Sequence, residues 1–217
     1  MAACCAQDPS TEGTNYFFNR WSKKYAKQFR KGKLEKEQRL LLEGVRKSAV
    51  VSQEILDIGC GVGALHLTLL KEGAAKSTGV DIADGMLERA KEFAEQLGLT
   101  EKTSYINGDF VRVSDSLADA DITMLDKVVC CYEDVETLVR KSSAKTRKVY
   151  ALTHPRESLF VASTFKIQIF FSKLFRAKFH PFWHNWADVR RIITDSGFVP
   201  LYENSTFTWS VVVYRRA

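Results

Sequence analysis

Runs of apolar residues recur along the chain at intervals that predict a sheet of parallel strands. Between the runs, apolar residues return every three or four positions, as they do on one face of a helix. Parallel neighbours need crossover connections of this length, so the alternation favours an α/β fold. The predicted strands are residues 54–58, 77–81, 103–106, 122–125 and 148–152, and the predicted helices between them are 64–72, 84–97 and 134–143.

The end of the chain follows a different pattern. Residues 198–203 and 206–214 are strand-like and are separated only by Asn204-Ser205, a connection that permits only an antiparallel pair. The predicted fold is a Rossmann-like three-layer α/β sandwich, with a mostly parallel, seven-stranded sheet and an antiparallel last strand. We expect a flexible N-terminus over 1–14, a helical arm or lid over 15–50, and a main domain over 51–217 with a lid insertion at about 155–186.

Composition is typical of a single globular domain, and the spacing of its cysteines favours a reducing compartment. The 217 residues are 45% hydrophobic, which is ample for one domain, and no apolar run is long enough for a membrane span. The start of the chain lacks the pattern of a signal peptide, so we expect a cytoplasmic protein. Neighbouring cysteines are poorly placed to bridge each other and lack metal-ligand spacing, so we expect no metal. The cysteines are Cys4, Cys5, Cys60, Cys130 and Cys131.

The net charge of +6 is concentrated near the N-terminus. Residues 20–47 contain eleven Lys or Arg residues against three Glu residues. A solvated helix face is the favoured interpretation, since basic stripes are common on soluble proteins. An RNA or acidic-membrane partner is the alternative.

The first predicted strand runs into a glycine-rich turn. Glycine allows positive φ in tight turns and lets a ligand approach the backbone, so the turn predicts a cradle for a nucleotide-like cofactor. The strand and turn read Ile55-Leu56-Asp57-Ile58-Gly59-Cys60-Gly61-Val62-Gly63.

Acidic residues mark the ends of the next three strands. Because ligands of an open parallel sheet lie beyond the carboxyl ends of the strands, these residues are expected to share one site with the glycine turn. Asp81 can accept the hydroxyl hydrogens of a ribose, and Asp109-Phe110 offers a carboxylate to an exocyclic amine and a ring to a purine. Asp126-Lys127 completes the set.

Together these residues resemble the class I S-adenosylmethionine-dependent methyltransferases, whose first motif is similar to Leu56–Gly63. The resemblance implies S-adenosylmethionine as the cofactor, with Asp81 holding the ribose and Asp109 the adenine amine. Ile82 and Phe110 would then flank the adenine, and the turn of Gly59, Cys60, Gly61 and Gly63 would face the methionine portion. A nicotinamide-binding domain is the rival, but its glycines follow G-x-G-x-x-G, whereas this turn reads G-x-G-x-G.

Within that family the chain looks most like small-molecule O-methyltransferases of the magnesium-protoporphyrin type. The likeness rests on the aromatic arm Asn15–Trp21, the segment Val128–Tyr132 and the stretch His184–Val189. In the porphyrin enzymes the residue before the Tyr of the middle segment tends to be His, and here it is Cys131. This difference puts porphyrin methylation in doubt and leaves sulfur open as the accepting atom. The arm would close over the cofactor, with Tyr16, Trp21 and Tyr25 as wall residues.

Methyl transfer needs a base only when the acceptor must lose a proton, because the sulfonium is already activated. His154, directly after the fifth strand, and His184, in an aromatic stretch, are the candidate bases, and Cys131 and Tyr16 complete the candidate catalytic set. Each histidine has the alternative of a hydrogen-bonded wall residue. His66 is interpreted as structural or solvent-facing.

Residues 159–179 contain six phenylalanines interspersed with Lys166, Lys173, Arg176 and Lys178. A core or lid helix is favoured because the apolar face is broad, and peripheral membrane contact is the alternative. The predicted function is methyl transfer to oxygen or sulfur of a small, hydrophobic molecule. The alternatives are a small-thiol S-methyltransferase, a non-catalytic cofactor-binding protein and an RNA methyltransferase. A nucleic-acid partner is disfavoured.

Overall fold

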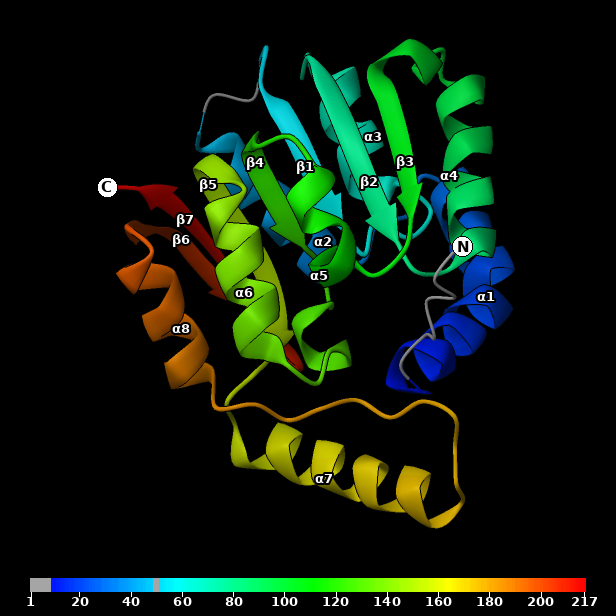
Figure 1. Ribbon diagram of the computed structural model, residues 1–217, viewed down its shortest axis with the longest axis vertical. Helices are drawn as coiled ribbons and strands as arrows, with labels where there is room; N and C mark the ends of the chain where they lie inside the picture. The colour runs from blue at the N-terminus through cyan, green and yellow to red at the C-terminus, as the bar shows by residue number, and fades with distance from the viewer. Residues whose placement is uncertain (1–8, 49–50) are drawn as a thin grey trace, which may run out of the picture.

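The computed structural model describes residues 9–48 and 51–217, and its centre is a seven-stranded sheet (Figure 1). The strand order is β3-β2-β1-β4-β5-β7-β6, and β7 runs antiparallel to both of its neighbours. The predicted fold class is therefore confirmed. The strands are β1 (Glu54–Ile58), β2 (Lys76–Asp81), β3 (Thr103–Asn107), β4 (Ala120–Leu125), β5 (Thr146–Pro155), β6 (Phe198–Ser205) and β7 (Trp209–Arg216).

Helices cover both faces of the sheet. In Figure 1, α5, α6 and α8 lie in front of the sheet and α2 and α3 lie behind it. Each face has its own apolar core, because the central parallel strands are buried on both sides. The helices are α1 (Pro9–Arg30), α2 (Lys36–Arg46), α3 (Ala64–Lys71), α4 (Asp84–Gln96), α5 (Phe110–Val113), α6 (Val135–Ala144), α7 (Leu159–Leu174) and α8 (Trp186–Asp195).

Side-chain caps fix where several helices begin. The Asp134 carboxylate accepts the backbone N–H of Thr137 at 3.0 Å, and Asn185 and Ser158 cap α8 and α7 in the same way. Because Asp134 is the cap, α6 begins one residue later than predicted.

The C-terminal part of the sheet differs from the prediction in two places. The strand β5 extends to Pro155 instead of ending at residue 152, because residues 153–155 pair with 209–211 of β7. The turn lies at residues 206–208 instead of Asn204-Ser205, and it is closed by the Thr206 N–H donating to the carbonyl of Trp209 at 2.8 Å. Pairing with β7 therefore lengthens β5, and pairing within the hairpin carries β6 on to Ser205.

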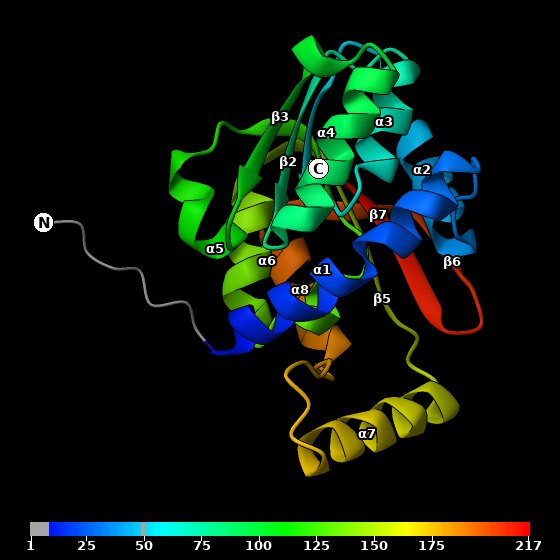
Figure 2. The same cartoon turned by 90° about the vertical axis from the view of Figure 1, so that its right-hand side faces the viewer.

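The helix α1 begins at Pro9, within the segment expected to be flexible, and residues 1–8, which include Cys4 and Cys5, lie outside the described residues. Figure 2 shows α1 crossing below the sheet next to α4. The Asn19 amide joins them, because it donates to Asp84 Oδ1 at 2.6 Å and accepts from the Gly85 N–H at 2.8 Å. The arm is thereby held at the start of α4.

The helix α7 stands away from the sheet in both ribbon views (Figures 1 and 2). Only Val161 and Phe165 of this helix are buried, so the expectation of a helix packed in the core is wrong for its other side chains, and the lid stays a prediction. Across residues 9–48 and 51–217, no helix is both long enough and apolar enough to cross a bilayer.

Candidate active site

A cavity of about 480 Å³ lies beyond the carboxyl ends of β1, β2 and β4 and is walled on one side by α1 and the start of α2. This volume is within the range of small-molecule sites. Ten of the predicted cofactor residues line the cavity, whereas Gly63 is the N-cap of α3 and does not. The ten are Asp57, Gly59, Cys60, Gly61, Asp81, Ile82, Asp109, Phe110, Asp126 and Lys127.

The glycine turn needs its glycines for two reasons. Gly59, Gly61 and Gly63 have φ angles of 65°, 54° and 81°, which side chains disfavour. A Cβ at Gly59 would lie 2.4 Å from Cγ2 of Val128. A Cβ at Gly61 would meet no protein atom within 4 Å, so the backbone there faces open space.

The Asp57 carboxylate is held by a buried histidine, His66 of α3. The Nδ1 atom of His66 lies 2.8 Å from Asp57 Oδ2, and Nε2 lies 3.1 Å from the Tyr105 hydroxyl. His66 has no exposed surface, so it is structural and not solvent-facing. Its ring holds the end of β1 in register with the first turn of α3.

Asp81 connects the second strand to the glycine turn. Its two oxygens accept the N–H groups of Gly61 at 2.7 Å and Ala83 at 2.8 Å. Burial raises the pKa of Asp81 to about 6, against the opposing effect of these two hydrogen bonds. A carboxylate has four lone-pair sites, so two remain for hydroxyl donors.

Asp109 lies at the next strand end and caps α5 by accepting the Val111 N–H at 2.9 Å. The Tyr132 hydroxyl also donates to Asp109, at 2.9 Å to Oδ2. Burial and the neighbouring Asp109 carboxylate raise the pKa of Tyr132. The phenol therefore stays protonated and acts as a donor that fixes Asp109.

Asp126 and Lys127 face the N-terminal arm. The Lys127 ammonium pairs with Glu35 and, at 2.7 Å, with Glu37, and the Gln38 amide donates to Asp126 Oδ2 at 2.9 Å. Burial lowers the pKa of Lys127, but Asp126 and the two glutamates raise it further, so it is a fixed cation. Lys127 also has a φ of 60°, an uncommon conformation for a side-chain-bearing residue.

Cys131 alone among the predicted catalytic residues lines the cavity. His154 is buried within β5, where Nδ1 lies 2.9 Å from the Pro155 carbonyl and the ring stacks on Trp186. It was expected after the strand, and the pairing with β7 explains the difference. Burial lowers the pKa of His154 to about 4.

The other two predicted catalytic residues lie outside the lining. The Nε2 atom of His184 lies 2.9 Å from the Tyr132 carbonyl, so this histidine supports the segment that carries Cys131. Burial lowers the pKa of His184. Tyr16 is 52% exposed and has the Lys178 ammonium over its ring.

Sequence reasoning found Tyr25 in the cavity wall but missed most of the wall that the arm contributes. One local signal was available, because Glu35 and Gln38 form the capping box of α2. That pattern predicts where the helix begins, although not what its side chains face. The missed arm residues are Thr14, Phe18, Gln28, Phe29, Lys33, Glu35 and Gln38. Within the described part of the chain, no group of three or more His, Cys, Asp or Glu residues is arranged to hold a metal ion.

A parallel sheet with one antiparallel strand and a glycine turn facing an acidic second strand end defines a nucleotide-cofactor site of the methyltransferase type. Residues 55–155 match the family described as a methyltransferase domain. This match and the shared fold support the predicted resemblance to the class I S-adenosylmethionine-dependent methyltransferases.

Similar proteins are of two kinds: solved structures that match over most of the chain, and curated sequences that match over about 60 residues. The magnesium protoporphyrin IX methyltransferase of Synechocystis PCC 6803, crystallised with bound S-adenosylmethionine, has the same fold, with 20% identity, a TM-score of 0.72 and coverage of 99% of this chain and 100% of that chain. The sterol 24-C-methyltransferase of Aspergillus fumigatus is 38% identical over 60 residues, which are 28% of this chain and 16% of that protein. The ribosomal protein L11 methyltransferase of Photobacterium profundum is 36% identical over 63 residues, 29% of this chain and 21% of that protein. The chain thus covers only a small part of these curated relatives.

Proposed function

We propose that the protein binds S-adenosylmethionine in the cavity and transfers its methyl group to oxygen or sulfur of a small, hydrophobic molecule. The observation that carries this proposal is the buried Asp81 carboxylate, held against the open backbone of Gly61 at the carboxyl edge of the sheet. This pairing supplies an acceptor for ribose hydroxyls next to a turn without side chains. Asp109 and Phe110 would take the adenine.

The acceptor would occupy the part of the cavity near the arm. Phe18, Phe29 and Val128 contribute apolar surface there, and Tyr25 and Cys131 add polar atoms. Burial raises the pKa of Tyr25, so this phenol is a hydrogen-bond donor and not a base at neutral pH. Alignment against the methyl group would then supply most of the rate, and an acceptor that ionises readily needs no base.

The predicted catalytic residues take different parts in this proposal. Cys131 is a wall residue of the acceptor region, with its thiol donating to the Lys127 carbonyl at 3.2 Å. His184 positions that wall through the Tyr132 carbonyl. A base role for His154 or Tyr16 would require each to reach a cavity that it does not line.

Calorimetry with S-adenosylmethionine tests the donor assignment. Asp81→Asn should weaken binding at least about tenfold, because a charged acceptor of buried hydroxyl hydrogens is lost. Asp195→Asn, which changes an exposed aspartate on α8, should bind as the unaltered protein does. Equal affinity for both variants would refute the ribose assignment.

A second measurement tests catalysis. Release of S-adenosylhomocysteine should be detected with at least one of a panel of hydroxylated aromatics, porphyrins and small thiols. Tight donor binding with no turnover across the panel would instead support a non-catalytic cofactor-binding protein. Turnover only with RNA, with salt-sensitive RNA affinity, would move the acceptor class to nucleic acid.

A further inference from the structure

The outward side of α7 carries exposed apolar side chains from its first residue to its C-cap. Seven large apolar side chains between its first residue and its C-cap are exposed, with Leu159 91% exposed and Phe175 75% exposed. The opposite side is anchored, because Phe165 is buried against Trp183 and Trp209. The exposed set is Leu159, Phe160, Ile167, Phe170, Phe171, Leu174 and Phe175.

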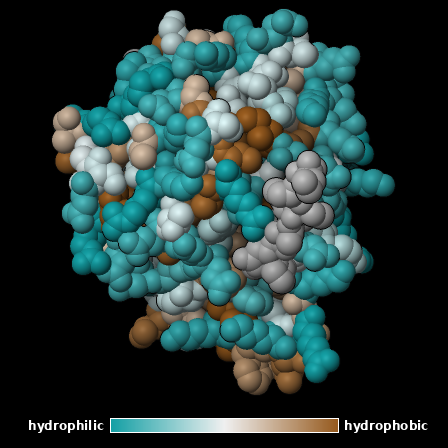
Figure 3. All heavy atoms as spheres, viewed as in Figure 1, coloured by the Kyte–Doolittle hydropathy of each residue, from teal (hydrophilic) through white to brown (hydrophobic). Residues whose placement is uncertain are grey.

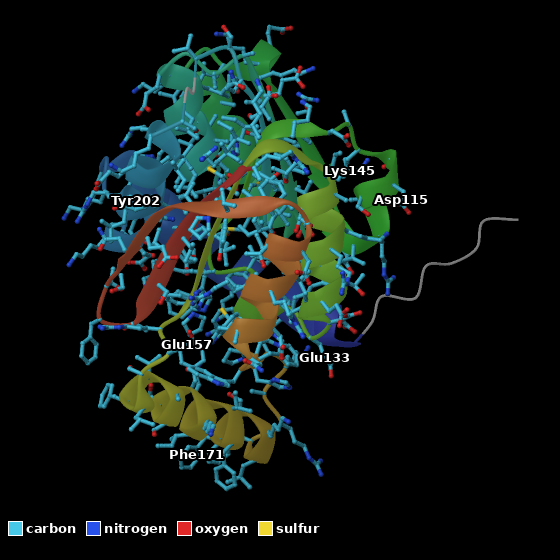
Figure 4. The ribbon with its side chains drawn as sticks, turned by 90° about the vertical axis from the view of Figure 1, so that its left-hand side faces the viewer. Asp115, Glu133, Lys145, Glu157, Phe171 and Tyr202 are labelled. Carbon is cyan, nitrogen blue, oxygen red and sulfur yellow. The ribbon has the colours of Figure 1, made fainter. Side chains whose placement is uncertain are left out.

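These side chains form one surface and not a scatter. At about 3.6 residues per turn, Phe160, Ile167, Phe171 and Leu174 lie on the same side of the helix. Figure 4 shows Phe171 on this helix at the end of the molecule, and Figure 3 shows apolar residues gathered at the same end. Phe207, in the turn between β6 and β7, is 70% exposed and its ring centroid lies 5.4 Å from that of Phe160, which extends the surface. Contiguous apolar surface of this kind marks an interaction site.

The charged residues of α7 and of the segment directly after it are all positive. From residue 159 to residue 179 the chain contains Lys166, Lys173, Arg176 and Lys178 and no acidic residue. Lys166 and Lys173 are exposed and seven positions apart, so they lie two turns apart along one edge of the apolar surface. Long basic side chains can reach from such an edge to phosphate groups while their stems cover apolar surface.

We propose that the outward side of α7, together with Phe207, is a docking surface for a lipid bilayer that contains anionic phospholipid. The apolar side chains would enter the boundary between head groups and acyl chains, with α7 parallel to the membrane. Lys166, Lys173 and Arg176 would pair with lipid phosphates and raise the affinity for anionic over zwitterionic membranes. With 16 residues the helix is too short to cross the bilayer, so it would lie on the surface.

Two other occupants fit the surface less well. A second copy of the chain would bring two sets of the four basic residues together with no acidic residue of α7 to offset them. A lid closing over the cavity would have to turn the outward side of α7 toward the cavity. That rotation would break the ring contacts of Phe165 with Trp183 and Trp209. A bilayer uses both the apolar surface and the charges while those contacts stay in place.

Co-sedimentation of the full chain with phosphatidylcholine vesicles, and with vesicles of phosphatidylcholine and phosphatidylglycerol, tests the proposal. Binding should be strong only with the mixed vesicles and should weaken as salt is added, because surface charges are screened. The pair Phe170→Ser and Phe171→Ser, and separately the pair Lys166→Glu and Lys173→Glu, should each weaken binding at least about tenfold. All four side chains are exposed, so the fold is expected to persist, and donor affinity measured by calorimetry verifies it.

Matched controls change exposed apolar and basic residues that lie away from α7. Val51→Ser with Leu97→Ser, and Lys91→Glu with Lys102→Glu, alter exposed side chains and should leave vesicle binding unchanged. Equal binding to both kinds of vesicle, or equal losses in the control pairs, would overturn the proposal. So would a dimer, seen by light scattering, that the Phe170 and Phe171 changes dissociate.

Discussion

At the scale of single residues, the proposed donor half of the cavity, around the glycine turn, Asp81 and Asp109, is built from backbone as much as from side chains. Gly61 and Gly98 share a left-handed backbone, with φ of 54° and 67°, and neither has a protein atom within 4 Å of an added Cβ. They differ in place, because Gly61 lines the cavity and Gly98 follows α4. The two glycines therefore separate the conformational role of glycine from its role in ligand approach.

Gly61→Ala and Gly98→Ala should lose similar stability, about 1 to 2 kcal/mol each, because both put a Cβ on a left-handed residue. Only Gly61→Ala should also lose affinity for S-adenosylmethionine, since its new methyl group enters the cavity. Urea unfolding and calorimetry on both variants provide the two measurements. Unchanged donor affinity in Gly61→Ala would show that the ligand does not approach this turn.

At the scale of elements, the cavity is completed by contacts between parts of the chain that are far apart in sequence. Gln38 of α2 reaches Asp126, 88 positions later, and Glu35, just before α2, reaches Lys127, 92 positions later. Strand ends and the glycine turn are local patterns, so the donor half could be predicted from the sequence. The arm contacts have no local pattern, and neither does the pairing with β7 that moved His154 into β5.

Lys127→Met should loosen the attachment of α2. The change leaves Asp126, Glu35 and Glu37 close together without their cation, so the free energy of unfolding should fall by about 2 kcal/mol. Amide exchange in α2 should quicken at the same time. Lys148→Met, which removes an ion pair at the exposed edge with Asp121, should cost less than about 1 kcal/mol and leave α2 protected. Comparable losses in the two variants would argue against a specific attachment.

At the scale of the whole molecule, two buried groups oppose each other as the pH changes. Burial raises the pKa of Asp81 from an ordinary 3.8 to about 6 and lowers that of His154 from an ordinary 6.5 to about 4. Between about pH 4 and pH 6, folded Asp81 holds a proton that the unfolded chain has released, so its contribution to stability falls as pH rises. Folded His154 lacks a proton that the unfolded chain binds, so its contribution rises. The two slopes have opposite signs and similar size, about 1.4 kcal/mol per pH unit.

Asp81→Asn should therefore reveal the slope that His154 contributes. Between about pH 4 and pH 6, the free energy of unfolding should gain about 1.4 kcal/mol per pH unit relative to the unaltered protein. Urea unfolding at a series of pH values without donor measures this difference, and Asp195→Asn serves as the control that keeps the original profile. Parallel profiles for the unaltered protein and Asp81→Asn would mean that Asp81 does not titrate as stated.

The parallel strands all end toward the side of the molecule where α7 lies, as Figure 1 shows. With α7 resting on a bilayer, the edge of the sheet that holds the cavity is turned toward the lipid. If both proposals hold, a hydrophobic acceptor dissolved in the membrane would meet the protein in two dimensions, while the water-soluble donor would arrive in three. The reaction rate would depend on the mole fraction of acceptor in the membrane. Adding inert lipid at constant total acceptor would slow turnover by surface dilution.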